Sequence, residues 1–274
     1  MQLDPNAVYV TAIKLMYGLS QQGWSTTVDL VHNHLNVVDQ PGYSAIIYTN
    51  DSPPSTELTT GLAVRALYDV VTSMATQEPG FYKVASNIRF KGQAVGRILI
   101  SRRHPTPTSL SSSDRNHSNT TTTVDDLRGY NLPSAIASLR ADSGLIPDPD
   151  LDFFTIIYHY DGDNLHSQEV FSAMFAGLAS VALFDNDGLC PWLTVVSSSG
   201  NVIVRFTERP RQKLLGWHIS RTLYLLVYRL FLVQRIFQVM RFTLLYHGRP
   251  IGDGFIKRMP SGEEASALGL TASQ

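Results

Sequence analysis

One stretch decides the fold that we predict: it begins with the apolar strand Tyr43-Ser-Ala-Ile-Ile-Tyr48 and the polar break Thr49-Asn-Asp-Ser-Pro-Pro54. A helical pattern then runs from about Ser55 to Gln77, and two further strands meet at Lys91-Gly92-Gln93 before the stretch ends at Arg103. Glycine at the tip of this hairpin supplies the positive φ that a tight turn requires. The order of elements is therefore a strand, a helix and a hairpin.

Residues 153–207 repeat this order. The Ile-Ile-Tyr sequence of residues 46–48 recurs at 156–158, an offset of 110, and Gly92 matches Gly200 at an offset of 108. One small gap therefore aligns the two copies. In the second copy the strand, the polar break, the helix and the hairpin turn are Phe153–Tyr158, Asp161–Asn164, Leu165–Phe184 and Ser199–Asn201.

A third, partial copy lies near the end of the chain. It consists of a helix over Trp217–Met240 and a hairpin over Phe242–Ile256, which turns around Gly248. Together the three stretches predict an α+β fold of three related helix-plus-β-hairpin units with antiparallel sheet. Two of the units are complete strand–helix–hairpin repeats.

The chain divides into four predicted segments, of which two fold and pack together as one compact domain. These are residues 1–103, with a helix over 6–22 and the first repeat, 104–150 as a linker, 151–258 with the second and third units, and 259–274 as a flexible tail. The linker is expected to be mostly disordered, with a short helix around Pro133–Arg140. Residues 104–125 are rich in Pro, Ser, Thr and Asn, and such a segment cannot bury enough apolar surface to offset the entropy of ordering.

The segment Leu214–Met240 is the most apolar run in the chain. It predicts a buried helix, or one whose second face contacts another subunit or a protein partner. Its seam follows steps of four and three, as in a heptad, through Leu226, Leu230, Val233, Phe237 and Met240. Arginines interrupt the run, so we do not expect it to be a transmembrane segment.

Charge is divided unevenly along the chain. Residues 1–200 carry 11 Lys and Arg against 19 Asp and Glu, whereas residues 201–258 carry 11 against 2. We expect the basic part to dock on the acidic part, so that Arg221, Arg229 and Arg235 each pair with a carboxylate from residues 1–200. A basic patch for nucleic acid or an anionic membrane is the alternative, although the arginines do not form the run that nucleic-acid binding favours.

Cys190 is the only cysteine, so the chain can form neither an intrachain disulfide nor a cysteine zinc site. The opening Met1-Gln-Leu-Asp-Pro-Asn6 lacks the basic region of a signal peptide, which favours the cytoplasm or the nucleus. Glycosylation sequons at Asn50, Asn116 and Asn119 leave secretion open.

Two pairs of residues are candidate metal ligands. Asp161 and Asp163 follow an apolar strand, where carboxylates can hold Mg²⁺ or Mn²⁺ for phosphate or sugar-nucleotide chemistry. At a break between a strand and a helix the same residues would also serve as helix caps. His32 and His34 share one face of a predicted strand, as some zinc and iron sites require, or form an unmetallated pair.

Three short stretches carry a resemblance to a known group of proteins. They are Gln93-Ala-Val-Gly-Arg-Ile-Leu-Ile100, Arg249-Pro-Ile-Gly-Asp-Gly-Phe-Ile256 and the opening Ala12–Trp24. In these stretches and in its helix–hairpin repeats, the chain is similar to filamentous-fungal hypothetical proteins of about this size that carry no assigned activity. The resemblance implies a lineage and no chemistry.

These observations favour a non-catalytic binding, scaffold or accessory protein that uses no cofactor. One alternative is a hydrolase or transferase that uses a divalent metal at Asp161 and Asp163, and another is a small-molecule-binding accessory protein of fungal metabolism. The sequence contains neither a Gly-x-Ser-x-Gly nucleophile motif nor a Gly-rich phosphate-binding loop.

The linker assignment can be tested by deletion. Removal of residues 106–122 should leave the unfolding midpoint of the protein almost unchanged, because nothing in this segment can anchor a core. Limited proteolysis of the intact chain should cut first within the same residues. A first cut elsewhere would contradict the assignment.

Overall fold

The structure is a computed structural model that describes residues 2–28, 34–37, 43–48, 58–76, 80–102, 143–182 and 187–259. For residues 34–37 and 43–48 it describes only the course of the backbone. Within these ranges the chain forms four α-helices and ten strands, and all paired strands run antiparallel. The predicted α+β class is confirmed.

The elements form two sheets and one group of helices. The helices are α1 (Pro5–Ser20), α2 (Thr60–Thr76), α3 (Ser167–Val181) and α4 (Gly216–Leu225), which continues as the π-helix η4 (Leu226–Gln234). The four-stranded sheet contains, in spatial order, β1 (His34–Val37), β2 (Tyr43–Tyr48), β4 (Gln93–Arg102) and β3 (Val84–Phe90). The six-stranded sheet contains β5 (Ser143–Pro147), β6 (Phe154–Asn164), β9 (Gln238–Tyr246), β10 (Arg249–Arg258), β8 (Val202–Glu208) and β7 (Trp192–Val196).

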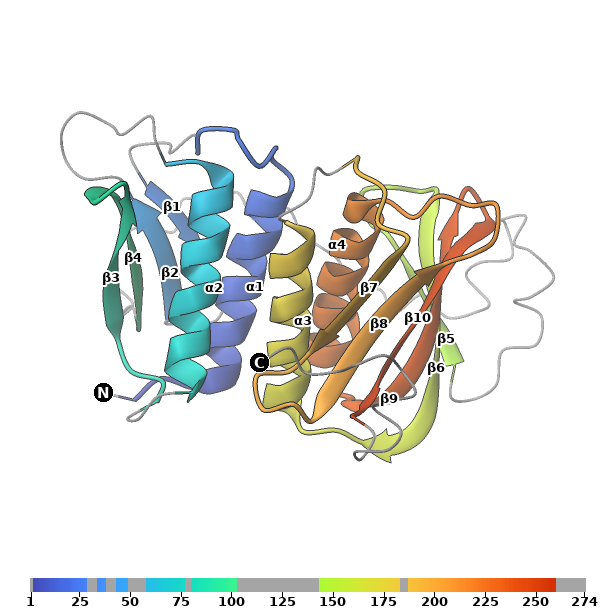
Figure 1. Cartoon of the computed structure of the whole chain (residues 1–274). Coiled ribbons are helices and arrows are strands. Elements are labelled where there is room, and N and C mark those ends of the chain that lie inside the picture. Colours follow the sequence, from blue (N-terminus) through green and yellow to red (C-terminus); the bar gives the residue numbers. More distant parts are fainter. Residues whose placement is uncertain are drawn as a thin grey trace.

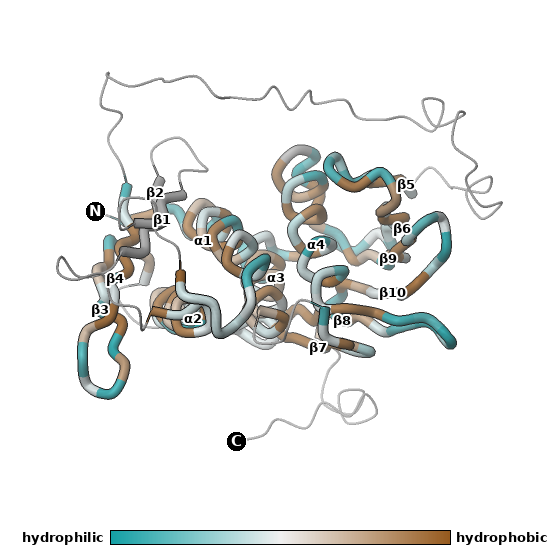
Figure 2. Tube along the Cα trace, turned by 90° about the horizontal axis from the view of Figure 1, so that it is seen from above, coloured by the Kyte–Doolittle hydropathy of each residue, from teal (hydrophilic) through white to brown (hydrophobic). Residues whose placement is uncertain are grey.

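The helices lie between the two sheets (Figure 1). Helices α1 and α2 cover the four-stranded sheet, α3 and α4 cover the six-stranded sheet, and α1 packs directly against α3. Many hydrophobic residues lie along the segments where these layers meet (Figure 2). No described helix covers the outer face of the six-stranded sheet, which we call the open face. No helix in the described part of the chain is long and apolar enough to cross a membrane.

Helix α1 is buried on nearly all sides because it contacts α2, α3, α4 and β2. Its side chains Val8, Tyr9, Ile13 and Met16 are almost completely inaccessible to solvent. The start of the helix is fixed by Asp4, whose carboxylate accepts a hydrogen bond from the backbone N–H of Asn6 at 2.9 Å. Pro5 occupies the first turn, where its missing N–H is not needed. The helix predicted over residues 6–22 is confirmed.

The two predicted complete repeats share their order of elements but differ in how their strands pair. Each has a strand, a helix and a hairpin, namely β2–α2–β3–β4 and β6–α3–β7–β8. The hairpin turns contain Gly92 and Gly200 with φ of 83° and 80°, as predicted. In the first repeat β2 pairs with β4, whereas β9 and β10 are inserted between β6 and β8 in the second. A common origin of the repeats stays a prediction.

The third unit begins as predicted but its helix ends earlier. The helix was predicted over Trp217–Met240, but Arg235 adopts a left-handed conformation with φ of 55° and β9 begins at Gln238. The predicted helical extension is therefore wrong after Gln234. The π-helical bonding of η4 also shifts side chains away from heptad positions. Leu230 is buried as expected, but Phe237 is only partly buried, and the side chain of Val233 lies outside the described residues.

Strand β5 was not predicted. It occupies residues 143–147, inside the segment assigned to the linker, and pairs along the edge of β6. The predicted linker therefore ends before Ser143. The short helix expected around Pro133–Arg140 lies outside the described residues.

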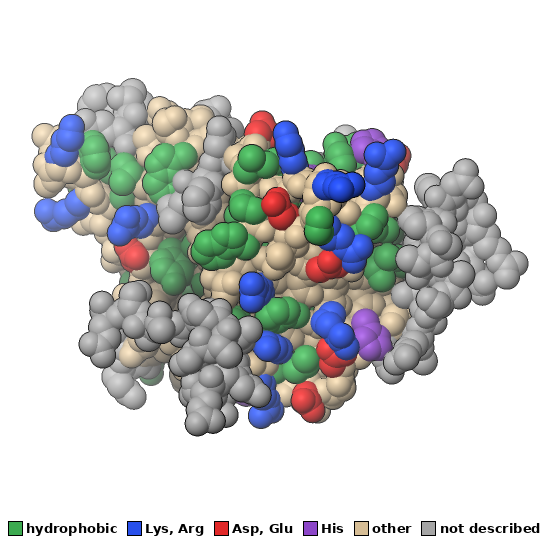
Figure 3. Space-filling model, turned by 45° about the vertical axis from the view of Figure 1, so that its right-hand side comes forward, with side chains coloured by type: hydrophobic (Ala, Val, Ile, Leu, Met, Phe, Trp, Pro, Cys, Tyr) green, Lys and Arg blue, Asp and Glu red, His purple; other side chains and the backbone are tan. Residues whose placement is uncertain are grey.

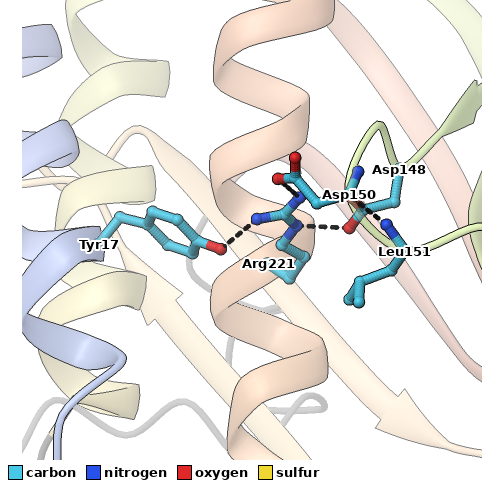
Figure 4. Close-up of polar contacts among 5 residues, drawn as sticks. All are labelled: Tyr17, Asp148, Asp150, Leu151 and Arg221. Carbon is cyan, nitrogen blue, oxygen red and sulfur yellow. Dashed lines mark hydrogen bonds and ion pairs between the residues drawn. The ribbon is translucent and has the colours of Figure 1, made fainter.

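A buried ion-pair cluster joins the first half of the molecule, residues 2–102, to the second half, residues 143–259 (Figure 4). Arg221 of α4 donates hydrogen bonds to both carboxylate oxygens of Asp148 and to Asp150, both in the β5–β6 connection. It also donates to the hydroxyl of Tyr17, on α1, at 2.6 Å. The side chain of Asp148 is 0% exposed, and its carboxylate also accepts from the backbone N–H groups of Asp150 and Leu151. The hydrogen bonds that Asp148 accepts therefore fix both the β5–β6 connection and α4.

The predicted docking of the basic part on the acidic part holds for Arg221, since Asp148 and Asp150 belong to residues 1–200. For the other two arginines, Arg229 and Arg235, the pairing stays a prediction. Within the described ranges, Arg229 and Arg235 have no carboxylate partner.

The Arg221 cluster can be tested by removing its cation. Arg221→Met should reduce the free energy of unfolding by about 3–5 kcal/mol, because the buried Asp148 carboxylate would lose its cation and keep only two backbone N–H donors among the described residues. Arg241→Met, which breaks an exposed ion pair with Asp161, should cost no more than about 1 kcal/mol. Urea unfolding of both variants gives the comparison, and equal losses would contradict a buried, uncompensated charge.

His218 predicts a loss of stability in acid. It is buried against Phe154, and burial lowers the pKa of its imidazole to about 4. The unfolded state takes up a proton at this residue near pH 6.5, whereas the folded state does not. The contribution of neutral His218 to the free energy of unfolding is therefore fully present above pH 6.5 and is lost as the pH drops towards 4. The loss between pH 7.5 and 5 should be about 2 kcal/mol.

The matched variant is His218→Asn, whose side-chain oxygen can still accept the hydrogen bond that the Leu215 N–H donates to the imidazole Nδ1 at 3.0 Å. Its unfolding free energy should vary less with pH than that of the wild type, whatever its absolute value. Parallel pH profiles for the two proteins, measured by urea unfolding, would rule out His218 as the source.

Candidate functional site

The predicted metal ligands Asp161 and Asp163 lie within β6, and not in a break after it. The strand continues to Asn164, although its pairing with β9 is irregular between Tyr160 and Asn164 and Gly162 has a φ of 95°. The predicted end of the strand before Asp161 is therefore wrong. A glycine in the left-handed region allows the chain to change direction while hydrogen bonding resumes at Asn164.

Asp161 is held by a cation from the neighbouring strand. Arg241 donates two hydrogen bonds to its carboxylate, at 3.0 and 2.7 Å, and Nε2 of His159 lies 3.6 Å from the same group. Asp163 is exposed and has no ion pair with any described residue. Metal binding by the two aspartates stays a prediction, and it would require Arg241 to release Asp161.

The histidine pair is not placed by the structure. His32 lies outside the described residues, and for His34 only the backbone, at the start of β1, is described. Among the described residues, no group of three or more His, Cys, Asp or Glu is arranged to hold a metal ion.

Asp161 contacts two members of a larger arrangement of side chains on the open face, Arg241 and His159. Side chains alternate between the two faces of a strand, and the strand register places one residue from each of the six strands in line. The first such line, which we call the Phe255 row, consists of Ser143, His159, Arg241, Phe255, Arg205 and Thr194. None of its members is buried, whereas residues next to them along the strands, such as Tyr158 and Phe206, are buried on the helix side.

A second line of residues lies beside it, two positions along each strand. This Asp253 row consists of Leu145, Ile157, Thr243, Asp253, Thr207 and Trp192. Trp192, on the edge strand β7, is 66% exposed, which is unusual for so large an apolar side chain. Between the Asp253 and Phe255 positions, Gly254 faces inwards, where a Cβ would lie 2.3 Å from the ring of Phe242. Glycine therefore lets β10 lie directly over that ring.

The four central members of each row line a shallow groove of about 350 Å³. It runs over the central strands β6, β9, β10 and β8, and its lining includes His159, Arg205, Arg241, Asp253 and Phe255. Charged side chains of both signs gather on this side of the molecule (Figure 3). The groove therefore combines charged side chains with the aromatic ring of Phe255.

Two of the arginines on this face are neutralised by carboxylates. Arg241 pairs with Asp161, and Arg209 donates two hydrogen bonds to Asp253, at 2.6 and 2.7 Å. Asp253 also accepts a hydrogen bond from the hydroxyl of Thr243 at 2.7 Å. Burial alone would raise the pKa of the Asp253 carboxyl, but the hydrogen bonds from Arg209 and Thr243 outweigh it and lower this pKa below its ordinary value. Asp253 is therefore ionised at neutral pH, and its carboxylate is already hydrogen-bonded to Arg209 and Thr243.

Arg205 and Lys257 provide uncompensated positive charge beside these pairs. Arg205 stands directly opposite Phe255 in the strand register, and it has no ion pair within the described part of the chain. The Lys257 ammonium lies 5.0 Å from the centre of the Phe255 ring. Diagonal neighbours on adjacent strands are about 7–8 Å apart, within reach of long side chains. The two cations can therefore converge on one ligand beside the ring.

Sequence reasoning did not find this face. The alternation Ile203-x-Arg205-x-Thr207 in β8 was visible, as was the excess of basic residues after residue 200. Because strands that are neighbours in the sheet are distant in the chain, however, the alignment of Arg205 with Phe255 and Arg241 depends on pairing that one sequence does not reveal.

Comparisons with known proteins add little to this geometry. No protein-family model matches the sequence, and a search of curated proteins finds no match. Among solved structures, the chain shows a faint likeness to the tandem DUF26 ectodomain of the Arabidopsis thaliana cysteine-rich receptor-like protein PDLP8. The identity is 9% over 94% of this chain and 93% of that one, with a TM-score of 0.26, which is too low to support an argument. The resemblance to fungal helix–hairpin proteins stays a prediction.

Proposed function

We propose that this protein is a non-catalytic binding protein that holds a small organic anion, a carboxylate or a phosphate ester, in the groove on the open face. The observation that carries the proposal is the Phe255 row, in which an aromatic ring lies between Arg241 and Arg205. Among the described residues, only Arg241 of these two has a carboxylate partner.

The charge balance of the groove favours an anion. The carboxylates of Asp161 and Asp253 already accept two hydrogen bonds each from Arg241 and Arg209. A further cation would have to displace one of these arginines. An anion would meet Arg205, whose planar guanidinium can donate two parallel hydrogen bonds to a carboxylate or a phosphate.

The size and shape of the groove favour a small molecule. A volume of about 350 Å³ lies at the lower end of the range of small-molecule sites in proteins. Phe255 offers an apolar surface for the body of the ligand, and the hydroxyl group of Thr207 lines the same groove. Such a combination of one flat apolar contact and a few polar groups is typical of binding sites that fix a ligand's orientation.

Other functions remain proposals of lower rank. A metal-dependent hydrolase or transferase at Asp161 and Asp163 gains no support from the pairing of Asp161 with Arg241. A contact of the Leu214–Met240 segment with a second subunit and a location in the cytoplasm or nucleus also stay predictions.

Phenyl phosphate is a suitable probe because it combines an aromatic ring with a phosphate ester. Isothermal titration calorimetry should detect its binding to the wild-type protein, and Arg205→Ala should weaken that binding at least tenfold through loss of a charge-assisted contact. The matched control is Arg89→Ala, which removes an exposed arginine from β3 of the other sheet. It should bind the probe as the wild type does.

Two further results are expected from the same titrations. Binding should weaken as salt rises, since the recognition is electrostatic. Inorganic phosphate, which lacks the ring, should bind more weakly than phenyl phosphate. The absence of any binding, or an equal effect of the Arg205 and Arg89 substitutions, would refute the proposed function.

A further inference from the structure

A second cavity lies where the two halves of the molecule meet. It has a volume of about 510 Å³ and is lined by Gln21, Gly23, Leu151, Phe153, Asp187, Trp217 and Tyr246. Gln21 and Gly23 follow α1 in the first half, whereas the other residues belong to the second half. Cavities at such junctions are common ligand sites, because binding there adds contacts to both sides.

Three aromatic rings line this cavity, and Tyr246 stands at a steep angle to the other two. The ring of Phe153 lies 5.3 Å from that of Tyr246, centre to centre, at an angle of 89°. The ring of Trp217 lies 5.8 Å from Tyr246 at 73°. All three side chains are partly exposed at the cavity, although Phe153 also stacks on His247, with ring centres 4.7 Å apart, and Trp217 contacts His218 at 3.9 Å. Rings set at such angles can present their electron-rich faces to one central group.

The charge around the cavity is negative. Asp187 is exposed, lines the cavity and has no ion pair with any described residue. The neighbouring Arg221 cluster places two carboxylates, Asp148 and Asp150, around one guanidinium, which leaves one negative charge in excess. Leu151, in the cavity wall, is tied to this cluster through its backbone N–H.

The N-terminus of α4, beside Trp217, could in principle favour an anion instead. Its N–H groups are largely satisfied within the protein, however. Those of Gly216 and His218 donate to the carbonyl oxygens of Gly188 and Leu215 at 3.0 and 3.1 Å, and that of Leu215 donates to the His218 imidazole. The nearest unpaired charge on the cavity wall is therefore the carboxylate of Asp187.

We propose that this cavity binds an organic cation, a quaternary or methylated ammonium group enclosed by Phe153, Trp217 and Tyr246 and balanced by Asp187. The faces of aromatic rings attract such cations, and weakly hydrated methylated ammonium groups lose little when they leave water. The site is separate from the groove on the open face, so either proposal can fail without the other.

Choline and its neutral carbon analogue 3,3-dimethylbutan-1-ol provide the sharpest probes, because they share a shape and differ in charge. Calorimetry should show choline binding to the wild-type protein at least tenfold more tightly than the neutral analogue. Saturation-transfer NMR should show contact between the protein and the choline methyl groups. Equal affinity for the two compounds, or no binding of choline, would overturn the proposal.

Variants locate the binding site. Asp187→Asn should weaken choline binding at least fivefold, and the matched control Asp69→Asn, at an exposed position on α2, should leave it unchanged. Trp217→Leu should abolish the preference for choline over the neutral analogue, provided that circular dichroism shows a folded protein. If Trp217→Leu fails to fold, the comparison of Asp187→Asn with Asp69→Asn decides alone, and equal affinities in those two variants would refute the proposal.

Discussion

The burial of Asp148 is the constraint on which the arrangement of the two halves depends. A carboxylate with 0% exposure is tolerable only if cations and N–H groups surround it, and here Arg221 and the backbone of the β5–β6 connection do so. Because Arg221 also reaches Tyr17 on α1, the charge that satisfies Asp148 fixes α4 against the first half. The directional hydrogen bond from Arg221 to Tyr17 therefore acts together with the close packing of α1 and α4 to fix their relative position. The stacking of Tyr17 on Tyr224, with centres 4.1 Å apart, acts at the same junction.

Much of the local structure could be predicted from the sequence, since it depends on neighbouring residues. Asp4 and Pro5 indicate the start of α1. Gly92, Gly200 and Gly248 indicate hairpin turns, and all three adopt a positive φ. Predictions failed where distant residues decide. Strand β5 is only five residues long and begins with Ser143 and Gly144, and it forms where the edge of β6 offers hydrogen-bond partners. The helix expected to reach Met240 ends at Gln234 because residues 238–246 complete the sheet between β6 and β10.

The candidate sites were predictable only in part, for the same reason. Asp161 was named from the sequence as a candidate metal ligand, but its partner Arg241 lies 80 positions away in the chain and could not be foreseen. The excess of basic residues after position 200 was also correctly noted. The sequence could not show that Arg221 turns inward to an acidic loop while Arg205 and Arg241 stand on an open sheet face. That division follows from the alternation of strand residues, which sends every second side chain away from the helices.

The two faces of the six-stranded sheet illustrate how one set of strands meets opposite requirements. On the helix side, Phe154, Phe206 and Phe242 fill the core, and Gly254 leaves room for the Phe242 ring. On the open face, the same strands carry arginines, threonines and a single phenylalanine in the middle of the row. That ring, Phe255, is only partly buried within the chain, and Arg205 beside it has no ion pair with a described residue. The groove on the open face is therefore lined by side chains that the core on the helix side does not use, which is the arrangement that the proposed binding site requires.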